Sequence, residues 1–200
     1  MYKIYVITDV EHIDFSKIDP FVQYLPQEKR AMALRFRRSV DRKNCMLSHF
    51  ILQYALYKNH GIRSFTLSNG RNGKPYLSDH PHIHFNISHC NNGCICAIAD
   101  SPIGIDIQNI RPFSWSVANH CSSEKEKQLL RDCTDPAVEF TKIWTMKESY
   151  LKMKGTGITV DLCAVDTTKL RDRIKTFELD GCYISVASAE SFPEEEICLN

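Results

Sequence analysis

One order of predicted elements, strand, helix, helix, strand, strand, occurs twice along this chain. The first run opens with alternating bulky β-forming residues at 2–7, and the second opens with a strand at 103–107. We therefore predict an α+β fold of two similar halves, residues 1–102 and 103–200, packed together. Any active site is expected in the cleft between them.

Helix start and stop signals set most of the element limits. Pro26 stands at a helix-start position, Ser39 or Asp41 can cap a second helix that ends before Gly61, and Ser123 with Glu126 forms a capping box. The longest predicted helix starts at Asp135-Pro136 and ends at Gly155. The predicted helices are 26–36, 39–58, 123–131 and 135–155, and the predicted strands are 2–7, 84–89, 94–99, 103–107, 174–179 and 182–188.

The overall charge argues against nucleic acid and membranes as general partners. Lys and Arg number 25 against 24 Asp and Glu, which gives a net charge of +1. Residues 1–7 are too short and too soon followed by acidic residues to be a signal peptide, and no apolar run approaches membrane-spanning length. We expect a cytoplasmic protein.

Nine cysteines are spread along the chain without a CxxC pair. Without a secretory signal, a disulfide framework is not expected. The densest zone is 80–96, where Cys90, Cys94 and Cys96 with nearby histidines offer the ligand types of a zinc site. The favoured interpretation is that these residues occupy strand positions, with cysteine as a small hydrophobe.

Basic residues are concentrated between positions 28 and 43. This concentration fits either an anion site or solvated helix faces. A second anion candidate is the turn at 69–77, whose glycines let the backbone approach a ligand and whose Lys74 can point at a phosphate. The basic cluster comprises Lys29, Arg30, Arg35, Arg37, Arg38, Arg42 and Lys43.

The segment 144–152 places Glu148 and Lys152 four residues apart on one helix face. Its apolar neighbours, Trp144 among them, indicate that part of the helix is buried. A buried Glu148 needs a partner for its charge, which a metal ion, a cationic ligand or a plain ion pair can supply.

Asp106 and Gln108 lie on one side of the strand that opens the second half, because side chains alternate along a strand. Together with Glu148 they offer two carboxylates and an amide carbonyl. Hard oxygen ligands of this kind suit Mg²⁺, which often bridges substrate phosphates.

Four motifs resemble those of the 4′-phosphopantetheinyl transferases, in the larger single-chain, pseudo-dimeric type that activates surfactin synthetase. They are Gly73-Lys74-Pro75, Phe85-Asn86-Ile87-Ser88-His89, Gly104-Ile105-Asp106-Ile107-Gln108, and Trp144 through Lys152, in that order. The resemblance covers nearly the whole chain. It implies an intramolecular pseudo-dimer that transfers phosphopantetheine from coenzyme A to a serine of an apo acyl or peptidyl carrier protein, releasing adenosine 3′,5′-bisphosphate.

The resemblance also implies roles for particular residues. Asp106, Gln108 and Glu148 would hold Mg²⁺ against the coenzyme A pyrophosphate, and Lys152 would contact that pyrophosphate near the transferred phosphorus. Glu148 is the candidate proton acceptor, and the catalytic set is Glu148, Lys152 and His89. The coenzyme A contacts would be Lys29, Lys43, Lys74, Pro75, Ser88, His89 and Lys152, with Arg30 and Arg42 as further candidates for the 3′-phosphate.

Gln108 departs from the family pattern, since many members of this type carry glutamate there. The amide removes one negative charge from the metal shell, although two carboxylates remain. The alternative function is a coenzyme A or nucleotide-binding module of the same fold that has lost turnover. Arg111, Phe113 and Trp115 are candidates for the rim that receives the carrier protein, and two fused halves predict a monomer.

Overall fold

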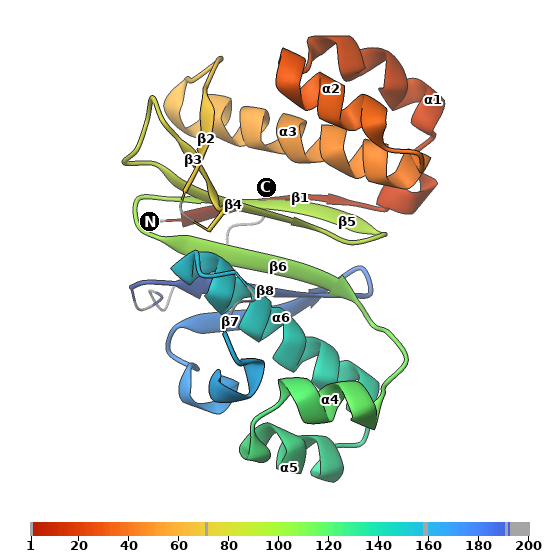
Figure 1. Ribbon diagram of the computed structural model, residues 1–200, viewed down its shortest axis with the longest axis vertical. Coiled ribbons are helices and arrows are strands. Elements are labelled where there is room, and N and C mark those ends of the chain that lie inside the picture. The colour runs from red at the N-terminus through yellow and green to blue at the C-terminus, as the bar shows by residue number, and fades with distance from the viewer. Residues whose placement is uncertain (1, 71, 158–159, 191, 193–200) are drawn as a thin grey trace.

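Two three-stranded antiparallel sheets lie face to face in the middle of the molecule, with helices outside each (Figure 1). The structure is a computed structural model and describes residues 2–70, 72–157, 160–190 and 192. Arg71 of the predicted turn and Cys198 lie outside this part of the chain. The strands are β1 (Tyr2–Thr8), β4 (His84–His89) and β5 (Gly93–Ala99) in the first sheet, and β6 (Ile103–Asn109), β7 (Ile174–Leu179) and β8 (Cys182–Ser188) in the second.

The two sheets have the same strand connectivity. Their orders are β1-β5-β4 and β6-β8-β7, so in each sheet the last strand in sequence lies between the first and the middle one. The predicted α+β fold with a repeated plan is confirmed. The division at residue 102 stays a prediction.

The first sheet is covered by α3 (Ser39–His60), with α1 (Phe15–Ile18) and α2 (Gln27–Arg35) beyond it. Helix α3 ends at Gly61, which has a φ of 68° and lets its N–H cap the last turn. Leu52 and Leu56 of α3 pack with Phe85 and Ile98 of the sheet. A short hairpin, β2 (Leu67–Asn69) and β3 (Pro75–Leu77), follows α3.

The second sheet is covered by α6 (Pro136–Lys154), with α4 (Trp115–Cys121) and α5 (Glu124–Asp132) outside it (Figure 1). The helix start and stop signals predicted from the sequence are present at both ends of α6. Asp135 accepts from the N–H groups of Ala137 and Val138, and Gly155 takes the left-handed conformation at the other end of α6. The Ser123 and Glu126 capping box is also present.

The predicted strands and the four predicted helices are confirmed to within a few residues. Two short helices, α1 and α4, fall in segments for which the sequence predicted no helix. Both pack on neighbouring elements, since Phe15 and Ile18 of α1 lie against the cluster that contains Met46. Ala118 of α4 packs with Leu130 and Ile143.

Residues from both sheets form one apolar cluster between them. Ile4 and Ile95 of the first sheet pack with Ile105, Ile107 and Val186 of the second. Each sheet alone would expose this surface to water, so the packing of one half depends on the other.

A hydrogen bond joins the facing edge strands of the two sheets. Asn86 of β4 accepts the N–H of Ile105 of β6 at 2.8 Å. Strands β4 and β6 are each at the edge of their sheet, so the N–H of Ile105 has no neighbouring strand to bond with. The Asn86 side chain supplies the acceptor instead.

Helix α6 approaches β6 closely at Gly104. A Cβ added there would lie 2.0 Å from the carbonyl oxygen of Ser149 and 2.4 Å from the nitrogen of Met153, both backbone atoms of α6. The glycine therefore allows the helix backbone to lie directly on the strand.

The β2–β3 hairpin of the first half holds the carboxyl end of α6. Lys74 donates to the carbonyl oxygens of Met153 at 3.2 Å and Ile103 at 3.1 Å, and Asn72 donates to that of Gly155 at 2.9 Å. The bonds to Met153 and Gly155 satisfy carbonyls that the end of a helix leaves without internal partners, and the bond to Ile103 ties the same lysine to the start of β6.

None of the described helices combines the length and the apolar character that crossing a membrane requires.

Candidate active site

A cavity of about 650 Å³ lies where β4, β6 and α6 meet. Strand β4 brings Ser88 and His89, β6 brings Asp106 and Gln108, and α6 brings Glu148 and Lys152, so six of the predicted site residues line this one space. Asp106 of the strand and Glu148 of the helix, whose proximity the sequence left open, therefore line the same cavity. Its other lining residues are Ile87, Asn109, Arg111, Pro112, Ser114, Val117, Phe140, Thr141 and Trp144.

Asp106 is fully buried at the base of the site and is surrounded by donors. Its Oδ1 atom accepts from Lys152 Nζ at 2.5 Å and from the Ser88 hydroxyl at 2.7 Å, and its Oδ2 atom accepts from the Gln108 amide at 3.1 Å. Lys152 also donates to the Ser88 hydroxyl at 3.0 Å. The carboxylate charge is thus balanced by one ammonium and two neutral donors.

Glu148 has a different environment. Its Oε1 atom is buried and accepts no hydrogen bond from the described residues. Burial raises the pKa of Glu148, Lys152 offsets part of that rise, and the Asp106 charge adds to it. A buried carboxylate oxygen without a donor is the kind of atom that a bound cation or a ligand proton would satisfy.

His89 lies at the end of β4, beside these charges. Burial lowers its pKa most, the charge of Lys152 and to a lesser extent that of Lys29 lower it further, and Asp41 and Asp106 oppose them. The imidazole is therefore neutral at pH 7 and can both donate and accept hydrogen bonds. Lys29 itself does not line the cavity.

The other predicted coenzyme A contacts are engaged elsewhere. Lys43 is buried and donates to the carbonyl oxygens of Val10, Glu11 and Ile13. Lys74 caps α6 as described above, and Pro75 pairs with Asn69 in the hairpin. None of these three lines the cavity.

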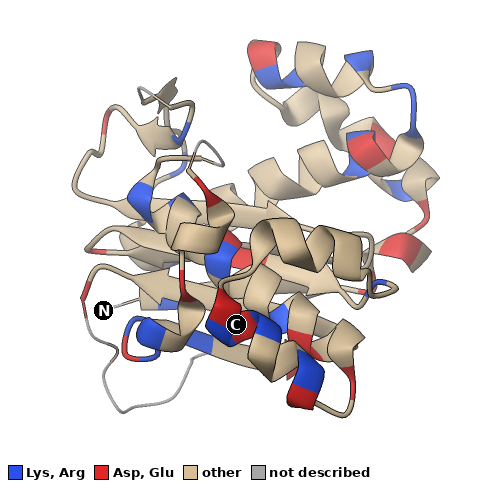
Figure 2. Ribbon diagram, turned by 60° about the horizontal axis from the view of Figure 1, so that its bottom comes forward, with Lys and Arg blue, Asp and Glu red and all other residues tan. Residues whose placement is uncertain are grey.

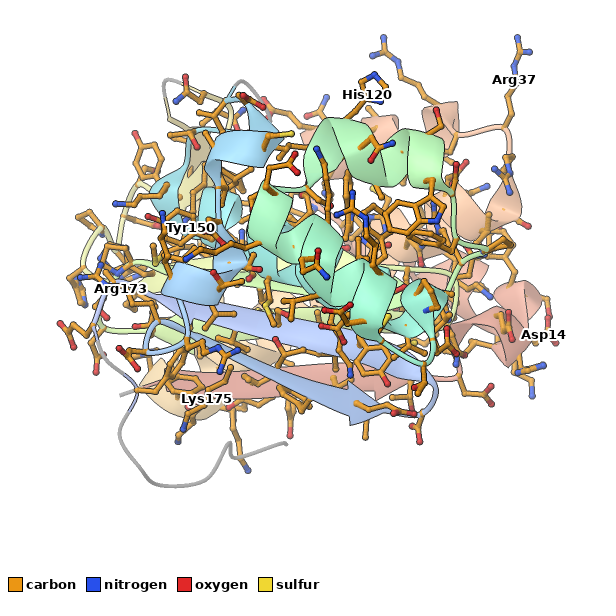
Figure 3. The ribbon with its side chains drawn as sticks, turned by 90° about the horizontal axis from the view of Figure 1, so that it is seen from below. Asp14, Arg37, His120, Tyr150, Arg173 and Lys175 are labelled. Atoms are coloured by element: carbon orange, nitrogen blue, oxygen red, sulfur yellow. The ribbon has the colours of Figure 1, made fainter. Side chains whose placement is uncertain are left out.

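Much of the basic cluster is exposed. Arg37, at the junction of α2 and α3, points away from the ribbon (Figure 3). Arg42 pairs with Asp19 at 2.6 Å. Basic and acidic positions are interspersed over the ribbon (Figure 2), which fits the near-zero net charge.

The helix signal extends further along α6 than Glu148 and Lys152. Phe140 and Trp144 precede them at the same spacing of four residues, and all four side chains line the cavity. Sequence reasoning interpreted Trp144 only as an apolar neighbour. The four-residue spacing itself could have indicated this continuous stripe.

A buried ion pair orients α6 from its other side. Lys147 donates to Glu126 at 2.7 Å and to the carbonyl oxygen of Leu162 at 2.8 Å, while Glu126 also accepts the N–H of Thr167. Adjacent residues of one helix thus serve different purposes, since Lys147 faces the protein interior and Glu148 the cavity.

The residues predicted for the carrier-protein rim lie at or near the cavity, and their role stays a prediction. Arg111 lines the cavity. Phe113 packs between Trp115 and Phe140, with ring centroids 5.0 Å and 5.9 Å away, and Trp115 remains 41% exposed beside Arg131. An exposed aromatic ring and a guanidinium therefore stand together near the cavity.

The zinc alternative has no support in the structure. Cys94 and Cys96 pack in the cluster under α3, whereas Cys90 packs between the two sheets. Within the described part of the chain, no group of three or more His, Cys, Asp or Glu side chains could hold a metal ion.

Comparisons with known proteins cover nearly the whole chain. A model described as 4′-phosphopantetheinyl transferase, N-terminal, matches residues 14–102, and one described as the 4′-phosphopantetheinyl transferase superfamily matches residues 102–194. The chain is 29% identical to 4′-phosphopantetheinyl transferase Sfp of Bacillus subtilis over 96% of this chain and 95% of that protein. It is 28% identical to 4′-phosphopantetheinyl transferase psf-1 of Bacillus pumilus over 92% of this chain and 81% of that protein.

A solved structure, the holo-[acyl-carrier-protein] synthase of Thermotoga maritima, matches with a TM-score of 0.32 and 14% identity, covering 45% of this chain and 64% of that one.

Proposed function

Because the chain belongs to the 4′-phosphopantetheinyl transferase superfamily, its reaction is phosphopantetheine transfer to carrier proteins, and we propose how this site performs it. The donor is coenzyme A, the acceptor is a serine of an apo carrier protein, and the second product is adenosine 3′,5′-bisphosphate. The observation that carries this proposal is the convergence of Asp106, Glu148 and Lys152 on one cavity.

The residues present fit a magnesium ion. Asp106 and Glu148 supply carboxylate oxygens, and Gln108 can supply its amide oxygen. The support is the buried Oε1 atom of Glu148, which accepts no hydrogen bond from the described residues. When bound, the cation would neutralise charge on the diphosphate and so ease departure of the bisphosphate.

Lys152 and Glu148 divide the remaining chemistry. The Lys152 ammonium, which is half-buried beside Asp106, is placed to donate to a diphosphate oxygen and to stabilise charge as the bond to the leaving group breaks. Glu148 accepts the proton of the attacking serine hydroxyl, a task suited to a carboxylate whose pKa is raised by burial. The in-line displacement at phosphorus then depends mainly on holding the serine hydroxyl and the diphosphate in the right positions.

We assign the phosphates to the neighbouring donors. Ser88 and neutral His89 stand at the end of β4 beside Lys152, and Lys29 is close enough to lower the His89 pKa. This group is our candidate for holding the coenzyme A phosphates. Lys43 is left out because its ammonium already donates to three backbone carbonyls.

The apolar stripe of Phe140 and Trp144 continues the cavity away from the charges. We place the carrier protein near Trp115 and Arg111, where an exposed ring and a guanidinium can meet an acidic helical partner. All of these residues come from one chain, so a monomer suffices for the reaction.

The test is intact-protein mass spectrometry of apo acyl and peptidyl carrier proteins after incubation with this protein, coenzyme A and Mg²⁺. We expect a mass gain of one phosphopantetheine, which is absent when EDTA replaces Mg²⁺. Coenzyme A binding without any gain on a panel of carriers would overturn the proposal in favour of a binding module.

A further inference from the structure

Two cysteines that are far apart in the sequence meet between the sheets. The sulfurs of Cys90 and Cys182 lie 3.8 Å apart, although 92 positions separate the two residues. Both side chains are buried, in the apolar cluster that joins the two halves. The described cysteines are free thiols.

Strand geometry brings these two side chains together. Along β4, alternate residues Asn86 and Ser88 reach β6, and Cys90 continues the same alternation just beyond the strand. Cys182 opens β8 opposite Asn109 of β6, whose amide donates to the Cys182 sulfur at 3.3 Å. One thiol therefore comes from the turn that follows β4 and the other from β8.

We propose that Cys90 and Cys182 form a reversible disulfide, made by exchange with a low-molecular-weight disulfide, that locks the two halves together. The thiol contact itself supports this, because a disulfide requires two side chains already directed at each other. The other buried thiols differ. Cys94, for example, lies beside the Ser48 hydroxyl on the opposite side of the first sheet.

The exchange is balanced in two steps. The Cys90 thiolate attacks one sulfur of the small disulfide, forming a mixed disulfide and releasing one small thiolate. Cys182 gives its proton to the released thiolate and attacks the Cys90 sulfur, and the second small group leaves as a thiolate that takes up the proton Cys90 lost on ionising. Two protein thiols are oxidised and one small disulfide is reduced to two thiols.

Cys90 is the better first nucleophile of the two. The hydrogen bond from Cys182, which is the largest effect, and those from the backbone N–H groups of Asn92 and Gly93 together outweigh burial and lower the pKa of Cys90 to about 7. Cys90 also begins a tight turn, closed by its N–H to the Gly93 carbonyl, in which Asn91 is exposed. Admission of a small disulfide requires this turn to open, which also breaks the bonds that join Asn92 to Val10 and Asp180.

The test uses the full chain in its native state. The reduced protein is incubated with glutathione disulfide, the remaining thiols are alkylated, and proteolytic peptides are identified by mass spectrometry. We expect a linked peptide pair containing Cys90 and Cys182, and a higher midpoint of thermal unfolding for the oxidised protein than for the reduced one. Recovery of both residues as alkylated thiols, or linkage mainly to other cysteines, would overturn the proposal.

Variants separate the two steps. Cys182→Ala should leave one glutathionyl group on Cys90 as the end product, formed more slowly than in the wild type because the hydrogen bond that lowers the Cys90 pKa is lost. Cys90→Ala should leave Cys182 unmodified. Cys94→Ala is the matched control, because it removes a neighbouring buried thiol and should leave the bridge intact. Peptide mapping of the wild-type protein by itself shows whether the Cys90–Cys182 bridge forms, so the test does not depend on the folding of any variant.

Discussion

Glu148 shows how one residue can weaken the fold and serve the reaction. Its buried Oε1 atom accepts no hydrogen bond from the described residues, and burial raises its pKa. A carboxylate held in this way costs stability, which proteins commonly accept at functional sites. The neighbouring Lys147, by contrast, is fully paired with Glu126 and backbone carbonyls.

Glu148→Gln should abolish most transfer while leaving the fold intact. We expect turnover to fall by at least about 100-fold, because the proton acceptor is lost, while thermal stability is unchanged or increased. Carrier mass spectrometry and circular dichroism measure the two quantities. Near wild-type turnover would remove Glu148 from the mechanism.

The same variant has a pH signature. Since the folded-state pKa of Glu148 is raised above 4.5, the folded protein binds this proton more tightly than the unfolded chain. Wild-type stability should therefore fall, relative to Glu148→Gln, as the pH rises from 4.5 through the raised pKa. Urea unfolding of both proteins across acidic pH would detect the difference.

Gln108→Glu should make the site more dependent on a cation. Gln108 donates to Asp106 Oδ2 at 3.1 Å, so a glutamate there would replace a hydrogen bond by repulsion between carboxylates. We expect a lower unfolding midpoint than wild type in EDTA, a larger rise on adding Mg²⁺, and activity at lower Mg²⁺ concentrations. Complete loss of activity at saturating Mg²⁺ would contradict this view of position 108.

The site was predictable where spacing on one element determines what comes together. Asp106 with Gln108 on a strand, and Glu148 with Lys152 on a helix, follow from periods of two and about 3.6 residues. The use of Lys43 and Lys74 within the protein was not predictable, because it depends on loops and helix ends from distant parts of the chain. The residues next to a lysine in the sequence do not indicate whether its ammonium group donates to backbone carbonyls inside the protein or faces a ligand.

At the scale of elements, the contact of α6 with β6 determines where Glu148 and Lys152 lie relative to Asp106. The strand presents Asp106, the helix presents Glu148 and Lys152, and Gly104 allows their backbones to touch. The limits of α6 were predictable from Asp135, Pro136 and Gly155, whereas short α4 had no comparable signals. A helix of only two turns is stabilised mainly by tertiary packing, which the local sequence does not show.

Gly104→Ala should destabilise the protein by at least about 3 kcal/mol, since the new methyl would meet backbone atoms that cannot rotate away. Transfer activity should fall as α6 is displaced. Gly70→Ala is the control, because its Cβ would have one contact, at 3.4 Å to the Lys74 carbonyl oxygen. Equal unfolding free energies for the two variants in urea would contradict the close approach.

Lys74→Met should loosen the carboxyl end of α6. Two carbonyl oxygens lose their donor, which we expect to cost about 1–2 kcal/mol in urea unfolding. Burial lowers the pKa of Lys74 from 10.5 to about 8, so between these values the unfolded chain binds this proton more tightly. Wild-type stability should thus rise with pH relative to the variant between about pH 8 and pH 10.5. Parallel pH profiles would show that Lys74 is not buried in this way.

At the scale of the whole molecule, the repeated plan produces one folding unit with two sheets. The apolar cluster between the sheets takes side chains from both halves, and the cavity does the same. The repeat was visible in the order of the predicted elements. The pairing of specific side chains across the halves was not, because it requires knowing how the sheets are turned toward each other.

The chain should unfold in one cooperative transition. We expect near-ultraviolet and far-ultraviolet circular dichroism to give the same urea midpoint, since neither half can bury its inner surface alone. Residues 1–102 expressed alone should be unfolded or associated. Two separated transitions, or a stable monomeric half, would contradict this dependence.

The bond from Ile105 to Asn86 has a meaning beyond the contact between the halves. Edge strands present free backbone groups that can recruit a strand from another molecule. Asn86 occupies the backbone N–H of Ile105 on β6 with a side chain, and a side chain cannot extend a sheet. This N–H is therefore not free to pair with a strand of a second copy of the chain. The same asparagine that aligns the two halves therefore also helps to keep separate molecules apart.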